Sequence, residues 1–144
     1  MAWVKRNRHG SVGLCAALAI AAAVLLGLAL PAQALLAPHY YEQARKEAAS
    51  VIVIAVRAVT PPSSAYGACQ VHGRVQAVER GAAYAVGQDV SLAVPCRTAG
   101  AQPPLGGMIY QDVDALRATP FGRAYLDAQG ALALSQYEPL KTWP

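Results

Sequence analysis

The hydrophobic and polar positions of the chain form one long apolar run near the N-terminus, followed by shorter alternating segments. Basic residues dominate the charge of residues 1–10, residues 11–30 are almost entirely apolar, and PAQA at 31–34 has the small-x-small pattern that signal peptidase recognises. This order predicts a secretory signal peptide over 1–34, cleaved after Ala34. The alternative is an uncleaved membrane anchor, because residues 11–30 are about long enough to span the apolar core of a bilayer.

The segments that follow predict one short helix and one buried strand. Residues 39–50 (HYYEQARKEAAS) are rich in helix formers, and Pro38 suits the first turn of a helix. Residues 51–59 (VIVIAVRAV) are mainly β-branched with almost no polar side, which is typical of a buried strand. The turn-forming sequence PPSSAYG ends that strand.

Two further segments alternate with a period of two and predict an antiparallel hairpin. Small or apolar residues occupy every second position over 69–77, and the same alternation runs over 89–96. A register with Cys69 opposite Cys96 brings apolar positions together throughout. A shift of the strand pairing by one residue would instead turn the apolar face of one strand towards solvent. The predicted pairs are Cys69 with Cys96, Val71 with Val94, Gly73 with Leu92 and Val75 with Val90.

The C-terminal third predicts a loop, a short helix and a closing hairpin. Residues 97–107 contain paired prolines and glycines and little apolar content, so we expect an exposed loop. Residues 112–118 suit a short helix, and residues 121–127 and 131–140 suit two strands around a turn. The pattern as a whole predicts a single, mainly β domain over 35–144 with one or two short helices, preceded by an N-terminal signal helix.

Cysteine usage agrees with export. Loss of the signal peptide would leave Cys69 and Cys96, an even number in a chain bound for an oxidising compartment, and this predicts one disulfide. Zinc binding is the alternative, but two cysteines with only His39 and His72 do not match the usual ligand spacings. We therefore expect a periplasmic or secreted protein, with membrane anchoring by residues 11–30 as the alternative.

The charge of the predicted domain argues against nucleic acid as a partner. The whole chain has a formal net charge of +4, but Lys5, Arg6 and Arg8 lie in the first eight residues. From residue 35 onward there are nine basic and eight acidic side chains, scattered along the sequence. A near-neutral domain of this kind lacks the electrostatic surface that phosphate backbones require.

Two sets of polar residues could form a site, one on a predicted strand and one at the predicted short helix, and His39 is a further single candidate. Gln70, His72 and Arg74 share the polar face of a predicted strand, where they form either a small hydrogen-bonding site or a solvated sheet face. His39 precedes a pair of tyrosines near the predicted mature N-terminus, where it is either a ligand or proton carrier or an ordinary surface residue at the start of a helix.

Asp112 and Asp114 form the second set. Their spacing is that of carboxylates in a calcium loop, but the later ligands of such a loop are missing. The preferred interpretation is that Asp112 caps the short helix and Asp114 lies in its first turn. As neighbours on an exposed helix they would also lack the cleft that a glycosidase pair needs. We therefore predict neither a metal site nor a cofactor.

The sequence contains no recognisable catalytic motif. It lacks a nucleophile elbow, a phosphate loop, a dinucleotide fingerprint and an H-E-x-x-H pair. So small a domain also leaves little room for both a packed core and a dry cleft. We expect a non-enzymatic binding module for an unknown protein or small molecule of the cell envelope, in contact with the membrane only through its N-terminal segment. The alternatives are a membrane-anchored envelope protein, or a small enzyme that uses His72 with Arg74, or Asp112 with Asp114.

The order of segments resembles that of netrin-like modules, which are related to tissue inhibitors of metalloproteinases. The resemblance lies in a helix before VIVIAVRAV, then ACQVHGRVQAVERG, VGQDVSLAVPC, a loop with glycines and GRAYLDAQGALALSQYEPL. It implies an OB-type five-stranded barrel. In the inhibitors an N-terminal cysteine chelates the zinc of the protease, but here the predicted mature start is Leu35 and the first cysteine after it is Cys69. The resemblance therefore extends to the fold and not to metalloproteinase inhibition.

Overall fold

The computed structural model describes residues 36–103, 106 and 108–144. The predicted signal peptide, the alternative anchor at 11–30 and part of the predicted loop lie outside these residues. Within the part of the chain that the structure describes, no helix has the length and apolar character needed to cross a membrane.

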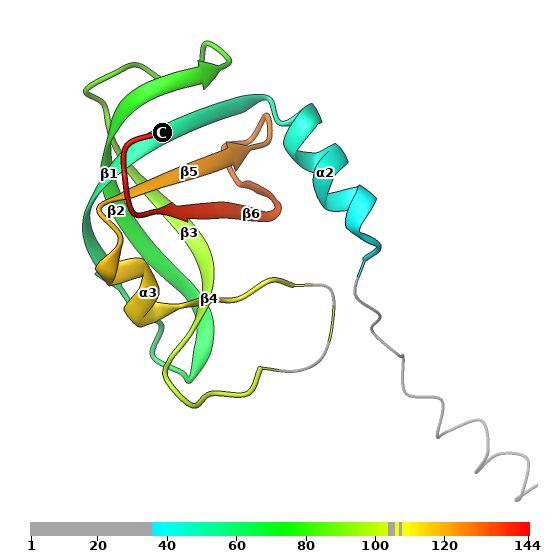
Figure 1. Cartoon of the computed structure of the whole chain (residues 1–144), viewed down its shortest axis with the longest axis vertical. Helices are drawn as coiled ribbons and strands as arrows, with labels where there is room; N and C mark the ends of the chain where they lie inside the picture. Colours follow the sequence, from blue (N-terminus) through cyan, green and yellow to red (C-terminus); the bar gives the residue numbers. More distant parts are fainter. Residues whose placement is uncertain (1–35, 104–105, 107) are drawn as a thin grey trace, which may run out of the picture. The chain divides into compact units, whose positions relative to one another are not determined.

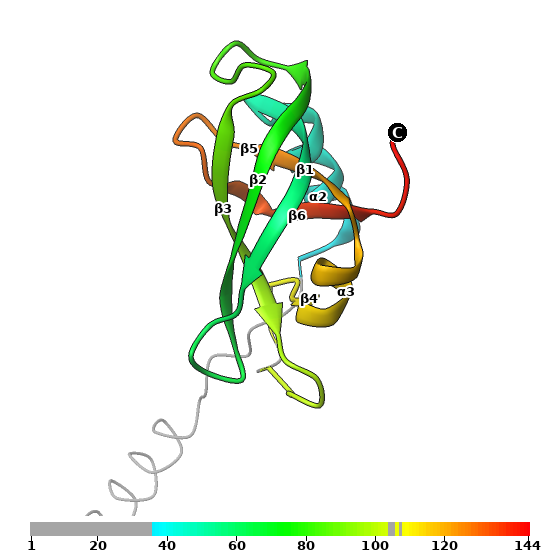
Figure 2. The ribbon, with the colours of Figure 1, turned by 90° about the vertical axis from the view of Figure 1, so that its left-hand side faces the viewer.

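The described residues form a curled six-stranded sheet with two short helices (Figure 1). In chain order the elements are α2 (Pro38–Glu47), β1 (Ser50–Thr60), β2 (Tyr66–Arg80), β3 (Asp89–Arg97), β4 (Gln111–Asp112), α3 (Val113–Ala118), β5 (Phe121–Leu126) and β6 (Leu132–Leu140). The strand order is β4-β3-β2-β1-β5-β6, with a parallel pair only between β3 and β4. The sheet bends into a half-barrel (Figure 2), so the predicted mainly β class is confirmed and is consistent with a small OB-like barrel.

The first strand is buried over only half of its length. Its residues 50–54 are buried, but from Ala55 onward the side chains are half-buried or exposed. The prediction of a buried strand over 51–59 is therefore wrong for its second half. The reason is that β1 pairs with β5 only as far as Ala55, opposite Phe121, and beyond this point β2 is its one neighbour in the sheet.

The predicted register of the β2–β3 hairpin is wrong by two residues. Cys69 lies opposite Val94, and Cys96 lies opposite Gly67. The turn sets this register: the Gly87 N–H donates to the carbonyl of Val75 at 2.8 Å, and Gly87 has a φ of +88° that favours glycine. A shift by two residues preserves the alternation, so each side chain keeps its predicted face. The remaining predicted pairs shift in the same way, to Val71 with Leu92 and Gly73 with Val90.

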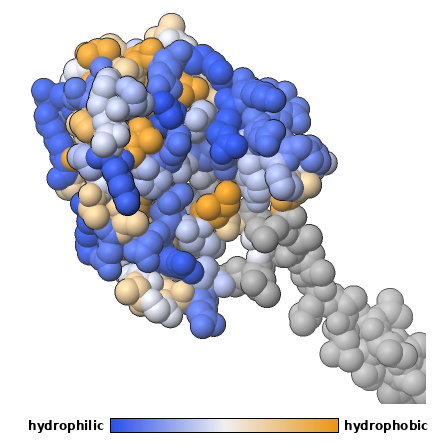
Figure 3. All heavy atoms as spheres, in the orientation of Figure 1, coloured by the Kyte–Doolittle hydropathy of each residue, from blue (hydrophilic) through white to orange (hydrophobic). Residues whose placement is uncertain are grey.

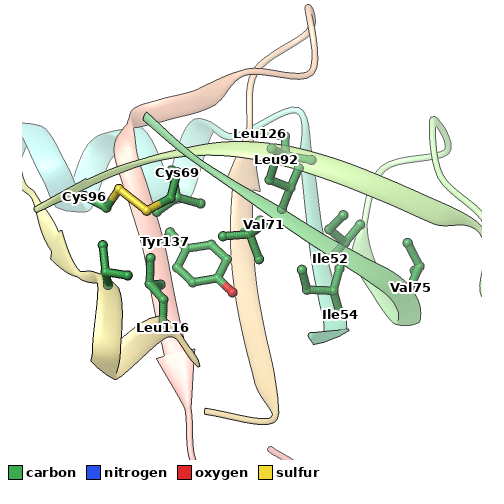
Figure 4. Close-up of a cluster of buried hydrophobic side chains, with 13 residues drawn as sticks. Ile52, Ile54, Cys69, Val71, Val75, Leu92, Cys96, Leu116, Leu126 and Tyr137 are labelled. Carbon is green, nitrogen blue, oxygen red and sulfur yellow. A yellow bond between two sulfur atoms is a disulfide. The ribbon is translucent and has the colours of Figure 1, made fainter. Parts of the chain in front are cut away.

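The disulfide joins the neighbouring strands β2 and β3 inside the core. Cys69 and Cys96 are bonded, with their Cα atoms 5.7 Å apart and both side chains fully buried, which confirms the predicted pair. Figure 4 shows the bridge beside Leu116 of α3 and Tyr137 of β6, in a cluster that also contains Ile52. The other members of this core are Ile54, Val71, Val75, Leu92, Val94, Val113, Ala124 and Leu126.

Helix α2 lies on the outside of the barrel and packs against β6. None of its side chains is buried. Nη1 of Arg80 donates to the carbonyl oxygens of Arg45, Lys46 and Ala48 at 2.8 to 3.3 Å, and these bonds satisfy carbonyls that the end of a helix leaves without partners. The junction between α2 and the sheet is therefore held by polar contacts.

Candidate functional site

The structure brings Gln70, His72 and Arg74 into one row on the exposed face of β2. His72 lies opposite Ser91 and Arg74 lies opposite Asp89 on β3. Ser91 Oγ donates to Gln70 Oε1 at 3.2 Å, and Arg74 donates to both carboxylate oxygens of Asp89 at 3.1 and 3.2 Å. His72 of this row lines a shallow hollow of about 340 Å³, together with Asp89 and Ser91 of β3.

The charges of this face are largely satisfied within the protein. Arg57 Nη1 also donates to Asp89, at 3.3 Å. The hydrogen bond from Arg74 is the main cause that lowers the pKa of Asp89. Ser91, His72 and Asp89 are the residue types of a hydrolytic triad, but the serine hydroxyl donates to Gln70 and the aspartate binds two arginines. This arrangement positions an ion pair rather than a nucleophile and its base.

The two aspartates act as predicted for a helix start. Asp112 Oδ1 accepts hydrogen bonds from the N–H groups of Asp114 and Ala115 at 2.8 and 3.3 Å, which is an N-cap of α3. Asp114 is largely exposed and lies 3.8 Å from Arg117. His39 is exposed at the start of α2, with its ring centroid 4.1 Å from that of Tyr40. Across the described residues no three His, Cys, Asp or Glu side chains group together as metal ligands.

A different hollow lies between α2 and β6, and the sequence analysis missed it. It measures about 500 Å³ and adjoins a second hollow of about 320 Å³, because Arg45 and Tyr125 line both. We call the two together the α2–β6 groove. Its lining residues are Glu42, Arg45, Lys46, Arg80, Ile109, Gln111, Tyr125, Ser135, Gln136, Tyr137, Glu138 and Pro139. Figure 3 shows that the surface over α2 is mainly hydrophilic.

The floor of the groove is an irregular part of β6. Ala124 pairs with Tyr137 but Leu126 pairs with Leu132, so β6 has extra residues opposite Tyr125. Within this bulge Leu134 and Ser135 have φ angles of 45° and 61°, and these are the two non-glycine residues with left-handed backbone in the described chain. Such a conformation costs roughly 1–2 kcal/mol per residue and is concentrated at functional sites.

The bulge positions a chain of hydrogen bonds that leads to α2. Gln136 is 6% exposed, and its Nε2 donates to the carbonyl of Leu134 at 3.1 Å. Its Oε1 accepts a hydrogen bond from Arg45 Nη1 at 3.1 Å. On the other side of the groove, Gln111 Nε2 donates to the carbonyl of Tyr137 at 3.1 Å. No local motif marks these residues, because they are separated in the sequence and meet only in the fold.

The acidic residue in the larger hollow is already paired. Arg123 donates to Glu138 at 3.0 Å and to both oxygens of Glu79 at 2.9 Å. The hydrogen bond with Glu79 is the main cause that raises the pKa of Arg123. Arg123 is thus shared by two carboxylates and compensates Glu138 only in part, and no ion pair joins Glu138 to Arg45 among the described residues.

Comparisons with protein-family models, curated proteins and solved structures gave no significant match to this chain. The resemblance to netrin-like modules therefore stays a prediction.

Proposed function

We propose that this protein is exported and works outside the cytoplasm as a small, non-enzymatic binding module, with its ligand in the α2–β6 groove. The basic, apolar and small residues of 1–34 support export. The buried Cys69–Cys96 disulfide supports it independently, since disulfides persist mainly in oxidising compartments. The partner on this proposal is a protein or small molecule of the envelope or the surrounding medium.

The bulge of β6 is the feature that favours the groove as the binding site. Leucine and serine pay a conformational cost in left-handed backbone, and a plain hairpin strand would avoid it. Here that backbone supplies the carbonyl that fixes the buried amide of Gln136, which in turn fixes Arg45. Side chains that are oriented in advance lose less entropy on binding, so this arrangement favours a ligand site.

The face of Gln70, His72 and Arg74 supports the proposal less well. Its hydrogen-bonding groups already bind one another, and Asp89 holds two arginines. A ligand there would have to break these contacts before it gained its own.

Selection of peptides tests the location of the site. We would pan a displayed random-peptide library against the protein purified from the cells that produce it, and map the selected peptides by amide chemical-shift changes. We expect shifts at Ser135 and Gln136. Gln136→Ala should weaken binding by up to about tenfold, because an Arg45 side chain no longer held by Gln136 costs about 0.5–1.5 kcal/mol to order on binding, whereas the matched surface variant His72→Ala should retain it. Peptides that shift the β2–β3 face instead would contradict the proposed site.

Two further measurements test compartment and chemistry. Intact mass spectrometry of the protein from the cell envelope, with alkylation before and after reduction, is expected to give a chain that starts at Leu35 with both cysteines protected until reduction. A full-length chain with free thiols would contradict export and cleavage. Turnover of substrates in a hydrolase panel that is lost in His72→Ala would contradict a non-enzymatic role.

A further inference from the structure

Arg45 differs from the other arginines that line hollows of the described surface. Arg57, paired with Asp89, and Arg117, paired with Asp114, already have carboxylate partners. Arg80 lines the smaller hollow of the groove, but its Nη1 donates to three carbonyls of the end of α2. Arg45 lines both hollows and has no carboxylate partner among the residues that the structure describes.

The contact with Gln136 orients Arg45 without neutralising it. A guanidinium group has five N–H donors in a planar fork, and the amide oxygen of Gln136 accepts from Nη1. An amide oxygen is uncharged, so the positive charge remains available to a ligand. Because Gln136 is itself bound to the carbonyl of Leu134 and is almost fully buried, it holds the guanidinium at a defined position beside the groove.

The surroundings of Arg45 favour a negatively charged group. Lys46 and Arg80 line the smaller hollow and add positive charge against the single carboxylate of Glu42. In the larger hollow Glu138 shares Arg123 with Glu79, so the excess of positive charge lies on the side of the smaller hollow. Polar groups of Gln111, Ser135 and Tyr125 line the same space and can donate to or accept from the remainder of an elongated ligand.

On the basis of the proposed function, we infer that Arg45 binds a carboxylate group of a peptide ligand in the α2–β6 groove. The planar fork of arginine matches the two oxygens of a carboxylate, and such charge-assisted pairs are among the strongest hydrogen bonds. The carboxylate belongs either to the C-terminus of the peptide or to an Asp or Glu side chain. Both sources present the same chemistry to Arg45.

Nuclear magnetic resonance titrations of the protein, as purified from producing cells, separate these sources. The probes are N-acetyl-alanyl-alanine with a free C-terminus, its C-terminal amide, N-acetyl-aspartate amide and inorganic phosphate. We expect saturable shifts of the Arg45 Nε–H signal and of the Ser135 and Gln136 amides with one or both carboxylates. We expect affinities at least about tenfold weaker for the amide, a difference of about 1.4 kcal/mol.

Variants test whether the geometry of the arginine matters. Arg45→Gln should weaken carboxylate binding about tenfold or more, and Arg45→Lys, which keeps the charge but loses the fork, should fall between it and the wild type. Arg97→Gln is the matched control, because it removes an equal charge from an exposed arginine at the end of β3 that does not line the groove. Its affinity should stay within about twofold of wild type, as expected for an exposed charge. A thermal melt of each variant shows whether the fold is retained.

The outcomes distinguish this inference from the proposed function. Equal weakening by Arg97→Gln and Arg45→Gln would overturn a specific carboxylate site in favour of diffuse charge attraction. Tighter binding of phosphate than of either carboxylate would also overturn it. Groove shifts of equal size with the amidated peptide would refute the role of the carboxylate but leave the groove as the binding site. Shifts confined to other surfaces would contradict both.

Discussion

Replacement of Tyr137 by phenylalanine should stabilise the protein. The Tyr137 side chain is 5% exposed, and its hydroxyl is the one buried side-chain polar atom of the described residues without a hydrogen-bond partner. Its ring lies among Ile54, Val71 and Leu116 (Figure 4), against the backbone of Gly122. In the unfolded chain water satisfies this hydroxyl, so folding removes its hydrogen bonds and returns none.

The expected gain follows from this difference. A buried polar group without a partner costs about 1–3 kcal/mol. Removal of the oxygen atom leaves a small void, which reduces this gain in stability by about 0.3 kcal/mol at the cost per volume typical of core cavities. Tyr137→Phe should therefore raise the free energy of unfolding by about 1–2 kcal/mol. For a domain of about 100 residues, each kcal/mol raises the midpoint of thermal unfolding by about 4–8 °C.

The same substitution should change the pH dependence of stability. Burial raises the pKa of Tyr137 above the ordinary tyrosine value of about 10. Below pH 10 both states keep the proton, so the hydroxyl adds no pH dependence. Above pH 10 the unfolded chain loses the proton and the folded chain retains it, so stability falls with rising pH by up to about 1.4 kcal/mol per unit. The advantage of Tyr137→Phe over the wild type should grow accordingly.

Urea unfolding at neutral pH and at several values above pH 10 measures both effects. Tyr66→Phe is the control, because Tyr66 is 39% exposed, whereas Tyr137 is 5% exposed. Its unfolding free energy should stay within about 0.5 kcal/mol of wild type. If Tyr137→Phe instead lowers stability by 1 kcal/mol or more, the hydroxyl has a partner such as a buried water, and the reasoning above is wrong.

Three further sets of variants test the fold. The double variant Cys69→Ala/Cys96→Ala should lose about 3.5 kcal/mol in urea unfolding, from the closure entropy of a loop between residues 27 positions apart, and reductant should destabilise the wild type alone. Asp112→Ala should cost about 1 kcal/mol by the same assay through loss of the N-cap, whereas the exposed neighbour Asp114→Ala should change little; equal losses would contradict the capping assignment. Gly122→Ala should cost about 1–3 kcal/mol because the added Cβ overlaps the Tyr137 hydroxyl, and combination with Tyr137→Phe should recover part of that loss in a double-mutant cycle.

The sequence by itself determined which faces of the strands are buried and which local contacts form. The period of two over 69–77 and 89–96 placed both cysteines inward, and the spacing before α3 identified Asp112 as its cap. These features depend on neighbours along the chain, so residue type and spacing are enough to predict them.

Only the tertiary structure decided the register, the depth of burial and the groove. A shift of the hairpin by two residues leaves every side chain on the same face, so alternation could not exclude it, and the turn at Gly87 selected it. The second half of β1 is half-buried or exposed because β5 begins at Phe121, opposite Ala55, and does not extend along it, which the composition of β1 does not reveal. The contact of Arg45 with Gln136 joins residues 91 positions apart across a bulge of left-handed leucine and serine. Local propensity disfavours such a backbone, so the packing of α2 against β6 had to create the site.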